Sequence, residues 1–545
     1  MRLFRTAAPP DRAAHNGGPP SMTRMVACRP RPSSLADVGG ASRTRTEDED
    51  ERQGRNWRPV RLLGRRRGWT GPPATERGSV LIIVLWIAFG LVSLALYFAD
   101  SMNFELHASA NRVSGMSAEQ AIEGAARYVN FLLNNQIAYG SNGCRLDPTT
   151  YQCTAVPVGD AHFWIIGRDT NNPVGPGQLA FGLVDEASKL NVNMATSNQL
   201  IWLPRMTVNL TAAILDWRNT SSTNGGSPTA TYYSMLQPPY QCKSAPFETV
   251  DELRLLFGVN MDALVGEDVN RNGVLDPGEN DDNGNGMCDP GVLEYLTVYS
   301  REPNTNSTGA ARVNVGSLSS TSITPLLSLL TTNFGAARAN QILGNLGLAT
   351  PAPGSGSTTG GRRGGAGGTG GSTGGATTTV TLASPLQFYV RSKMTETEFA
   401  QIATNLTVTT NAYIQGRVNV NTASVPVLAC LLNGDLAAAQ QLVNYRLANP
   451  NNLTSIAWVI DALGDGYSTD LQALEAGDYI TTQSYQVTAD IAALGAFGRG
   501  YRRVKFVFDT SKGTPLIVYR QDLSALGWAL GKDARQQWLL AQGTP

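Results

Sequence analysis

Side chains that could bind a metal ion are concentrated between Glu267 and Gly291. The first part of this stretch has oxygen-bearing side chains at alternate positions, then a glycine, then two more carboxylates: Asp268, Asn270, Asn272, Gly273, Asp276 and Glu279. This is the spacing of an EF-hand calcium loop, in which the cation takes about six to eight oxygen ligands. We predict a calcium site whose ligands are these five acidic and amide side chains and the carbonyl oxygen of Val274, with Gly273 allowing the sharp turn.

A second repeat overlaps the end of the first, and its predicted ligands are Asp281, Asn283, Asn285 and Asp289. Its twelfth position is Val292, so the closing carboxylate is missing, and Glu294 is the candidate to replace it. Asparagine at two positions lowers the charge of the first loop, so we expect weak affinity for calcium. Because no long helix follows the loops directly, a calcium site with a structural role is favoured over a calcium sensor of the paired EF-hand type. The alternative for both repeats is an Asx-rich surface turn without metal.

The rest of the sequence offers little catalytic chemistry. It contains three histidines and none of the motifs G-x-S-x-G or H-E-x-x-H. The formal net charge is zero and charged residues make up 16% of the chain, so no global attraction to nucleic acid is indicated. We predict that the chain is not an enzyme, and an extracellular hydrolase is the weakest of the alternatives.

The six cysteines form no C-x-x-C motif. Cys144 and Cys153 bracket a short polar loop and could close a disulfide in an oxidising compartment. Cys242 and Cys288 are a candidate second pair. Cys430 lies in an apolar run and is predicted to be a buried free thiol.

The element that must position the rest is the run Ser79–Ala99, which is uncharged and almost wholly apolar. A helix of this length spans about 30 Å, the hydrocarbon thickness of a bilayer. Arginines are dense just before the run, and acidic residues follow it at Asp100 and Glu105. By the positive-inside rule the N-terminus is therefore cytoplasmic and the large C-terminal part lies outside the cytoplasm.

The same helix is predicted to continue as a stem to about Asn134, with its upper half packed on a head domain. Apolar and small residues recur there at three- and four-residue steps: Leu106, Ala110, Val113, Ala121, Ala125, Tyr128 and Leu132. Residues 1–78 are rich in Arg, Pro and Gly, which predicts disorder. They are either a basic tail or the result of a start codon placed too early, with Met22, Met25 or Val60 as the alternatives.

The junction of this leader with the apolar run resembles a type IV prepilin signal. In that family the prepilin peptidase cuts after the glycine, here Gly78, and leaves Ser79 as the new N-terminus. Most members carry Glu at mature position five, where this chain has Ile83. A carboxylate in a membrane or fibre core is costly without a cation, and a subunit with no other ahead of it needs none. The absence is similar to the pattern of the protein K family, the large minor pseudopilins of type II secretion systems.

The resemblance implies a function and a location. The chain would be a single-pass protein of the bacterial inner membrane, with its large C-terminal part in the periplasm. It would cap the tip of the type II secretion pseudopilus and support its assembly and protein export across the outer membrane. Its partners would be the minor pseudopilins I and J, the major pseudopilin, the prepilin peptidase and secreted substrates.

The alternative function is a membrane-tethered helix-hairpin-helix protein for DNA binding and uptake. The segment Arg417–Ala423 and the later Asn444-Tyr445-Arg446 resemble such proteins. DNA binding there needs a hairpin whose backbone amides hold a phosphate, and here that turn ends in Asp435, whose charge repels one. We therefore favour a packing role for this module and predict no nucleic acid partner.

The predicted fold class is α+β. A pilin-like long N-terminal helix packs on an antiparallel sheet, and helical modules of SAM-like or helix-hairpin-helix type and the calcium loop are inserted. The expected boundaries are leader 1–78, transmembrane helix 79–99, periplasmic stem 100–134, head with the first SAM-like module and calcium loop 135–349, Gly/Ser/Thr-rich linker 350–379, second SAM-like module 380–480, and C-terminal strands 481–545.

Several local elements are also predicted. Residues 162–168 and 180–185 alternate in polarity and indicate a hairpin. Thr196 or Asn193 caps a short helix, and longer helices are expected at 208–217, 249–257, 425–432, 436–449 and 453–463. Glu252 completes a capping box with Thr249. The last three apolar runs, residues 484–495, 501–510 and 515–523, predict an antiparallel three-stranded meander that packs on the stem helix.

Overall fold

The computed structural model describes residues 79–139, 148–168, 178–219, 230–319, 322–348 and 379–532, with 534, 536 and 538. The chain divides into two units, Met1–Val84 and Leu85–Pro545. Of the first unit only the start of one helix is described. The predicted leader 1–78 lies outside the described residues, as does all but the last residue of the predicted linker 350–379.

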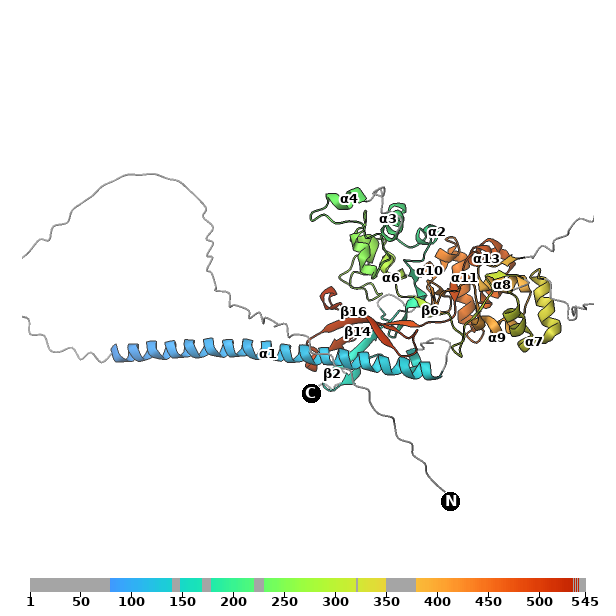
Figure 1. Cartoon of the computed structure of the whole chain (residues 1–545). Coiled ribbons are helices and arrows are strands. Elements are labelled where there is room, and N and C mark those ends of the chain that lie inside the picture. Colours follow the sequence, from blue (N-terminus) through green and yellow to red (C-terminus); the bar gives the residue numbers. More distant parts are fainter. Residues whose placement is uncertain are drawn as a thin grey trace, which may run out of the picture. The chain divides into compact units, whose positions relative to one another are not determined.

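Helix α1 spans Ser79–Tyr139 without interruption and is drawn in blue in Figure 1. Its first part exposes large apolar side chains from Val80 to Phe98. Among the described helices, one segment, Val80–Asn135, is long and apolar enough to cross a membrane. The single helix confirms that the apolar run continues into a stem.

The upper part of α1 packs on a sheet through residues three and four positions apart. The buried set is Ala118, Ala121, Ile122, Ala125, Ala126, Val129 and Leu133. The predicted stripe is correct here, where Ala121 and Ala125 are fully buried. It is wrong further down, where Leu106 and Val113 are 65% and 56% exposed. The described part of the sheet offers those two residues nothing to pack on.

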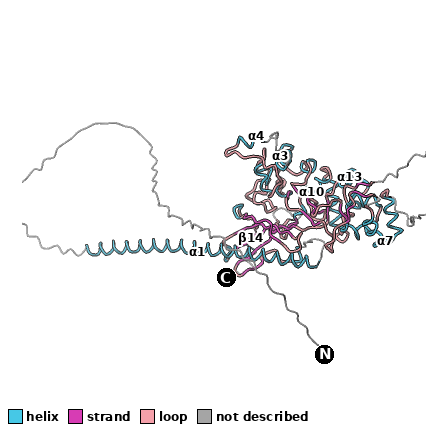
Figure 2. The backbone as a smooth tube through the Cα atoms, in the orientation of Figure 1, coloured by secondary structure: helices cyan, strands magenta, loops and turns pink. Residues whose placement is uncertain are grey.

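Six strands form the antiparallel sheet, in the order β1-β2-β14-β15-β16, with β3 also paired to β14. Their bounds are β1 Val156–Val158, β2 Ala161–Ile166, β3 Val184–Asp185, β14 Gln486–Leu494, β15 Arg502–Asp509 and β16 Leu516–Asp522. Figure 2 shows these strands gathered beside α1. The predicted C-terminal meander is therefore confirmed, and early strands pair with late ones.

The predicted hairpin between residues 162–168 and 180–185 is formed only in part, where the Gly167 N–H donates to the Ala180 carbonyl and the Gly182 N–H to that of Ile165. β2 pairs with β1 and β14, while β3 pairs with β14 beyond the end of β2. Between the two predicted segments, the described residues form one isolated bridge, Ile166 to Phe181. Alternating polarity marks a strand but does not say which strand is its partner.

The chain between β3 and β14 is largely helical and has its own core, which runs from Leu190 to Ile480. Both predicted helical modules contribute to this one core. The helices are α2 Ser197–Leu200, α3 Val208–Arg218, α4 Ala230–Met235, α5 Met261–Val265, α6 Val292–Tyr295, α7 Thr324–Asn345, α8 Pro385–Ser392, α9 Glu396–Ile402, α10 Val425–Leu431, α11 Leu436–Ala448, α12 Trp458–Leu463 and α13 Ser468–Glu475.

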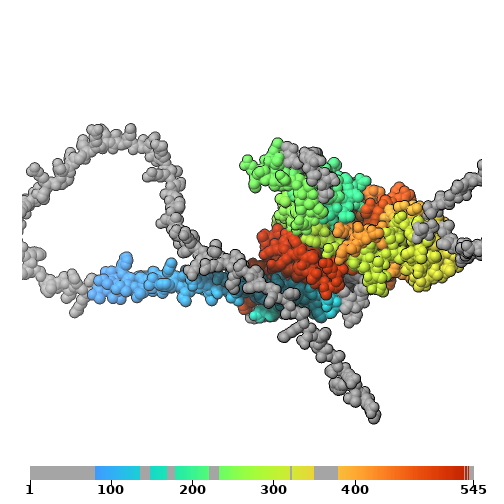
Figure 3. Space-filling model, in the orientation of Figure 1, coloured from blue at the N-terminus to red at the C-terminus, as the bar shows by residue number. Residues whose placement is uncertain are grey.

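Short strand pairs tie this helical region together. They are β4 Leu190–Asn191 with β5 Leu296–Thr297, β6 Arg301–Pro303 with β11 Tyr413–Gln415, β7 Val313–Asn314 with β10 Leu406–Thr407, β8 Ser317–Leu318 with β9 Val380–Thr381, and β12 Val418–Asn419 with β13 Ile480–Thr481. In Figure 3 the C-terminal strands, in red, lie between α1 and the green part of the helical region. The fold is α+β, as predicted.

The observed helix termini agree in part with those predicted from the sequence. Thr196, one of the two predicted caps, caps α2 in a reciprocal box with Gln199. The segment predicted as a helix at 249–257 is instead a 3-10 helix, Val250–Leu255, although Glu252 does accept the Thr249 N–H at 3.2 Å. The N-cap position of α10 is Ser424, and the hydroxyl of the nearby Thr422 donates to Asp185.

Candidate metal site

The first predicted calcium loop is folded around the carboxylate of Asp268. Its Oδ1 accepts the N–H of Asn272 and its Oδ2 accepts the N–H of Gly273, both at 2.8 Å. Gly273 has a φ of +83°, which only glycine adopts without strain. Burial raises the pKa of Asp268 to about 6, against the lowering effect of the Arg168 charge. The turn predicted from Gly273 is therefore present.

Glu279 closes the same loop. Its two oxygens accept the N–H groups of Asn270 at 3.1 Å and Asp276 at 3.0 Å. The carboxylate thus bridges the beginning and the end of the loop, the place that the twelfth residue of a calcium loop occupies.

The hydrogen bonds of the Asn270 and Asn272 amides indicate whether the side chains of the loop are suited to bind a cation. Each donates through Nδ2 to Asp276 Oδ2, at 2.6 and 2.8 Å. Asn270 Oδ1 is buried and has no hydrogen-bond partner, and the residue is 8% exposed. A buried amide oxygen without a partner is costly unless a cation or water meets it. The donor set of carboxylates and amides therefore fits calcium.

The loop is not a cage of carboxylates. Among the described residues no group of three or more His, Cys, Asp or Glu side chains is placed to hold a metal ion. Asp268, Asp276 and Glu279 instead accept hydrogen bonds within the loop. To coordinate calcium, the Asp276 carboxylate would have to give up the hydrogen bonds that it accepts from Asn270 and Asn272 and bind the cation instead.

The second predicted loop repeats the geometry of the first. Asp281 accepts the N–H groups of Gly284 at 2.7 Å and Gly286 at 2.9 Å. Asn283 and Asn285 both donate through Nδ2 to Asp289 Oδ2. The four predicted ligands of this loop are therefore brought together in the same pattern as those of the first.

The carboxylate at the closing position of the second loop is Glu267, which the sequence reading did not single out. Its oxygens accept the N–H groups of Asp282 at 2.9 Å and Asp289 at 3.0 Å, and its side chain is fully buried. It comes from the residue just before Asp268 and not from the end of the second loop. A search for acidic residues on both sides of the repeat would have found it.

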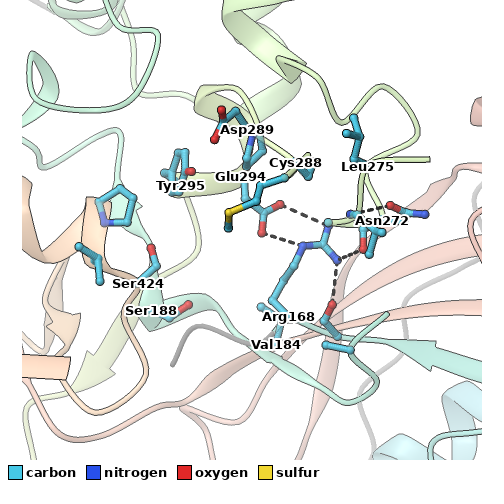
Figure 4. Close-up of a pocket in the computed structure, with 18 of the residues that line it drawn as sticks. Arg168, Val184, Ser188, Asn272, Leu275, Cys288, Asp289, Glu294, Tyr295 and Ser424 are labelled. Atoms are coloured by element: carbon cyan, nitrogen blue, oxygen red, sulfur yellow. Dashed lines mark hydrogen bonds and ion pairs between the residues drawn. The ribbon is translucent and has the colours of Figure 1, made fainter. Parts of the chain in front are cut away.

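Glu294, the predicted substitute, has a different role. It forms an ion pair with Arg168, with Nε to Oε1 at 2.8 Å, and the charge of Arg168 keeps the pKa of Glu294 low in spite of burial, which by itself would raise it. Arg168 also donates to the carbonyl oxygens of Arg271 and Asn272. Figure 4 shows this pair beside a cavity of about 310 Å³ lined by Asn272 and Cys288 among others.

A second arginine fastens the first loop to the sheet. Arg503 of β15 is fully buried and pairs with Asp490 of β14 through Nε and Nη2, and it donates to the carbonyl oxygens of Asn270 and Arg271. Arg503 of β15 and Arg168, just beyond the end of β2, thus hold three consecutive loop carbonyls. This contact joins the loop to the sheet on which α1 packs.

The other sequence-predicted positions have simpler outcomes. Gly78 lies outside the described residues, and Ser79 is the first residue of α1. Cys242 and Cys288 are free thiols, so the candidate second disulfide is not formed. Cys144 is outside the described residues. Cys430 is a buried free thiol, as predicted, and burial raises its pKa to about 12.

Side chains of the protein occupy the turn with which a DNA-binding hairpin would hold a phosphate. Asp435 caps α11 by accepting the N–H groups of Ala437 and Ala438 at 2.8 and 2.9 Å. The ring of Trp202 covers Gly434 so closely that an added Cβ would lie 2.4 Å from it. A phosphate would have to displace both groups, which supports the packing role predicted for this module.

A long helix that could span a membrane, with its upper part packed on an antiparallel sheet, defines the class of pilin-like membrane-anchored proteins. Comparison with known families then gives two matches, both to type II secretion system (T2SS), protein K, over residues 188–265 and 418–463. These two segments of the chain are thus similar to the protein K family of minor pseudopilins. Its members are structural components of type II secretion.

Other comparisons add little. No curated protein sequence matches the chain. A solved structure, the GspK-GspI-GspJ complex from the type 2 secretion system of enterotoxigenic Escherichia coli, matches with 9% sequence identity and a TM-score of 0.34. The match covers 74% of this chain and 96% of that chain. A TM-score this low does not by itself establish a common fold.

Proposed function

We propose that the chain is the minor pseudopilin at the tip of the type II secretion pseudopilus, where it supports fibre assembly and protein export. The observation that carries the proposal is α1, whose apolar first part is exposed while its upper part holds the sheet of the head. The large helical insertion between β3 and β14 also favours the end of a fibre. Copies of so large a head would collide if they were repeated along it.

A label on the head tests the position. We expect an antibody or gold label on the helical region to mark one end of each isolated pseudopilus. Label spread evenly along the fibres would overturn the tip assignment.

We further propose a single-pass anchor in the inner membrane, with the head in the periplasm and cleavage by the prepilin peptidase between Gly78 and Ser79. The apolar face of α1 and the arginines before it support this arrangement. Mass spectrometry of the native chain should find Ser79 at the N-terminus. Gly78→Val should leave the leader attached, whereas Gly71→Val in the same leader should not. An intact leader in the native chain would contradict the proposal.

The proposed partners are the minor pseudopilins I and J, the major pseudopilin and exported substrates. The support is the similarity of two segments to the protein K family, together with the solved GspK-GspI-GspJ complex, in which GspK is found with GspI and GspJ. Co-purification of the full chain with I and J in detergent tests it. The DNA-uptake alternative instead expects a salt-dependent shift of duplex DNA by the full chain, which we expect not to occur.

We also propose that the two loops bind calcium. The first site would use Asp268, Asn270, Asn272, Val274, Asp276 and Glu279, and the second Asp281, Asn283, Asn285 and Asp289 with Glu267 as its closing carboxylate. The unpartnered oxygen of Asn270 and the matching geometry of the loops support this. Bound calcium would neutralise these carboxylates and hold the loops closed.

Calorimetry on the full chain in detergent tests calcium binding. We expect uptake by the first site to be lost in Asp268→Ala and kept in Asp262→Ala, which changes an aspartate outside both loops. No heat in the unaltered chain, or unchanged uptake in Asp268→Ala, would remove the assignment.

A further inference from the structure

The turn between β14 and β15, residues 495–501, is where the head first contacts α1, counted from the apolar end of the helix. From Val80 to Val113 no residue of α1 is buried, whereas Ser114 is 3% exposed. Ser114 meets the turn, because its Oγ donates to the Ala496 carbonyl oxygen at 3.1 Å. The β14–β15 turn therefore lies at the end of the head that faces the apolar segment of the helix.

The backbone of the β14–β15 turn is held closely on two sides. Gly495 and Gly500 lie so near to Ser114 that a Cβ added to either would be 2.0 or 2.4 Å from its backbone. A Cβ on Gly498 would be 2.8 Å from the Trp538 ring. Packing against α1 and against Trp538 thus leaves the backbone of the turn little freedom to change.

Phe497, within this turn, has a conformation that packing in the head does not repay. Its φ of +59° and ψ of +27° are left-handed, which is unfavourable for a bulky side chain. Its ring is 82% exposed, more than any other large apolar side chain that the structure describes. Backbone strain that the surrounding structure holds in place is frequent at functional contacts. A rigid turn that presents an exposed ring also loses little conformational entropy when it binds a partner.

Two cationic side chains lie beside Phe497 in the chain. Arg499 and Arg502 are both exposed. Arg502 donates to the Tyr501 carbonyl oxygen at 3.2 Å, and among the described residues neither arginine forms an ion pair. Aromatic and arginine side chains are enriched in protein interfaces and in their energetic centres. The surface complementary to this turn is an apolar hollow with carboxylates at its edge.

We propose that the β14–β15 turn is a docking anchor for the head of a neighbouring pilin-like subunit. The Phe497 ring enters an apolar hollow of that subunit, and Arg499 and Arg502 meet carboxylates at its edge. The inference rests on the tip position and the partners I and J proposed above. In a fibre that this chain caps, every other subunit lies on the side of the apolar segment of α1, which is the side of the turn.

The membrane surface lies on the same side, but the length of α1 favours a protein. At about 1.5 Å per residue, Ser114 is about 22 Å along the helix from Ala99, where the apolar run ends. The headgroup region of one leaflet is only about 5–8 Å thick. The turn therefore stands clear of the headgroups when α1 is upright in the bilayer.

Two glycine variants separate binding from backbone strain. Phe497→Gly and Lys393→Gly each remove an exposed side chain from a left-handed backbone, with φ of +59° and +53°. Neither variant should unfold at a lower denaturant concentration than the unaltered chain, because glycine adopts this conformation freely. In detergent, Phe497→Gly should weaken binding of the full chain to purified minor pseudopilins I and J about tenfold or more. Lys393→Gly should leave the affinity unchanged, and Phe497→Tyr, which keeps the ring, should retain most of it.

The outcomes distinguish the docking anchor from the function on which it rests. Equal affinity of the unaltered chain and Phe497→Gly would overturn the docking anchor and leave the tip position standing. If the unaltered chain binds neither I nor J, the proposed partners fail and the docking anchor fails with them.

Photo-crosslinking in the living bacterium identifies what the turn contacts. With benzoylphenylalanine in place of Phe497 in the full chain, we expect an adduct that mass spectrometry identifies as a pilin-like subunit. The same substitution at Phe257, a phenylalanine of the helical region that is 38% exposed, is the control. An adduct of position 497 with lipid would make the turn a membrane contact, and an adduct with an exported protein would make it a substrate contact. Either adduct in place of the expected one would overturn the inference.

Discussion

Arg503 is the residue on which the junction between the sheet and the first loop most depends. Its guanidinium is fully buried, is paired with Asp490, and holds two loop carbonyls. Burial alone would lower the pKa of Arg503, but the Asp490 carboxylate raises it, so the side chain stays charged. Removing one partner of such a pair leaves the other charge buried without compensation.

Arg503→Met should therefore lower the free energy of unfolding by about 3–5 kcal/mol. The control is Arg520→Met, because Arg520 forms an exposed pair with Glu123 and is 53% exposed. That change should cost no more than about 1 kcal/mol. Denaturant unfolding of the full chain in detergent measures both. Equal losses would show that the buried pair does not hold the loop to the sheet.

Glu186 is a buried carboxylate whose contribution to the stability of the fold depends on pH. Burial by itself would raise the pKa of its carboxyl group, but the charges of Lys189 and Lys505 and the hydroxyls of Thr297 and Thr488 outweigh it and lower the pKa to about 2. A carboxyl whose pKa is lower in the folded chain stabilises the fold above the unfolded pKa, near 4.5. This contribution is lost as the pH falls from about 4.5 towards 2.

Glu186→Gln should thus be less stable than the unaltered chain by about 3 kcal/mol at pH 7, and the difference should shrink as the pH falls below about 4.5. Denaturant unfolding at a series of pH values measures it. Glu248→Gln, at a side chain that is 83% exposed, should stay within about 0.5 kcal/mol throughout. A difference that grows in acid would contradict the assignment.

At the scale of elements, the turn between α10 and α11 shows how the two helical modules meet. Trp202, which follows α2 in the first module, covers Gly434 in the second. Gly434 has a φ of +88°, and Gly347, at the end of α7, has a φ of +77° with nothing near its missing Cβ. The two glycines differ mainly in this contact.

Gly347→Ala should cost about 1–2 kcal/mol, from the left-handed backbone alone. Gly434→Ala should cost a further 1–3 kcal/mol or so, because the new methyl group collides with the Trp202 ring. Thermal or denaturant unfolding of the two variants gives the difference. If they lose the same stability, the modules do not depend on this contact.

The sequence predicted elements better than it predicted their partners. Apolar periodicity gave α1, the late strands and most helices of the second module, because burial imposes a regular spacing. It could not show that β2 and β3 both pair with β14, since that partner lies some three hundred residues further on. In the candidate site, spacing predicted that the side chains of each loop come together, but Glu267 was missed because it closes the second loop from outside the repeat.

At the scale of the whole molecule, the first loop lies where the sheet, the helical region and the C-terminal residues Trp528 and Ala529 meet. Arg503 holds the first loop to β15, Arg168 holds it to the segment just after β2, and the loop's amides donate to the carbonyl oxygens of Trp528 and Ala529. A ligand that binds only the folded loops would therefore stabilise the head as a whole. This stabilisation grows with ligand concentration, reaching about 2.7 kcal/mol at one hundred times the dissociation constant.

Calcium should accordingly raise the unfolding temperature of the full chain in detergent, and a chelator should lower it again. Magnesium at the same concentration should do much less, because it demands near-octahedral geometry and keeps several of its waters. Asp268→Ala should lose part of the calcium response while keeping any general effect of salt. If calcium and magnesium raise the temperature equally, the effect is ionic screening, and the loops are surface turns of the kind their asparagines also allow.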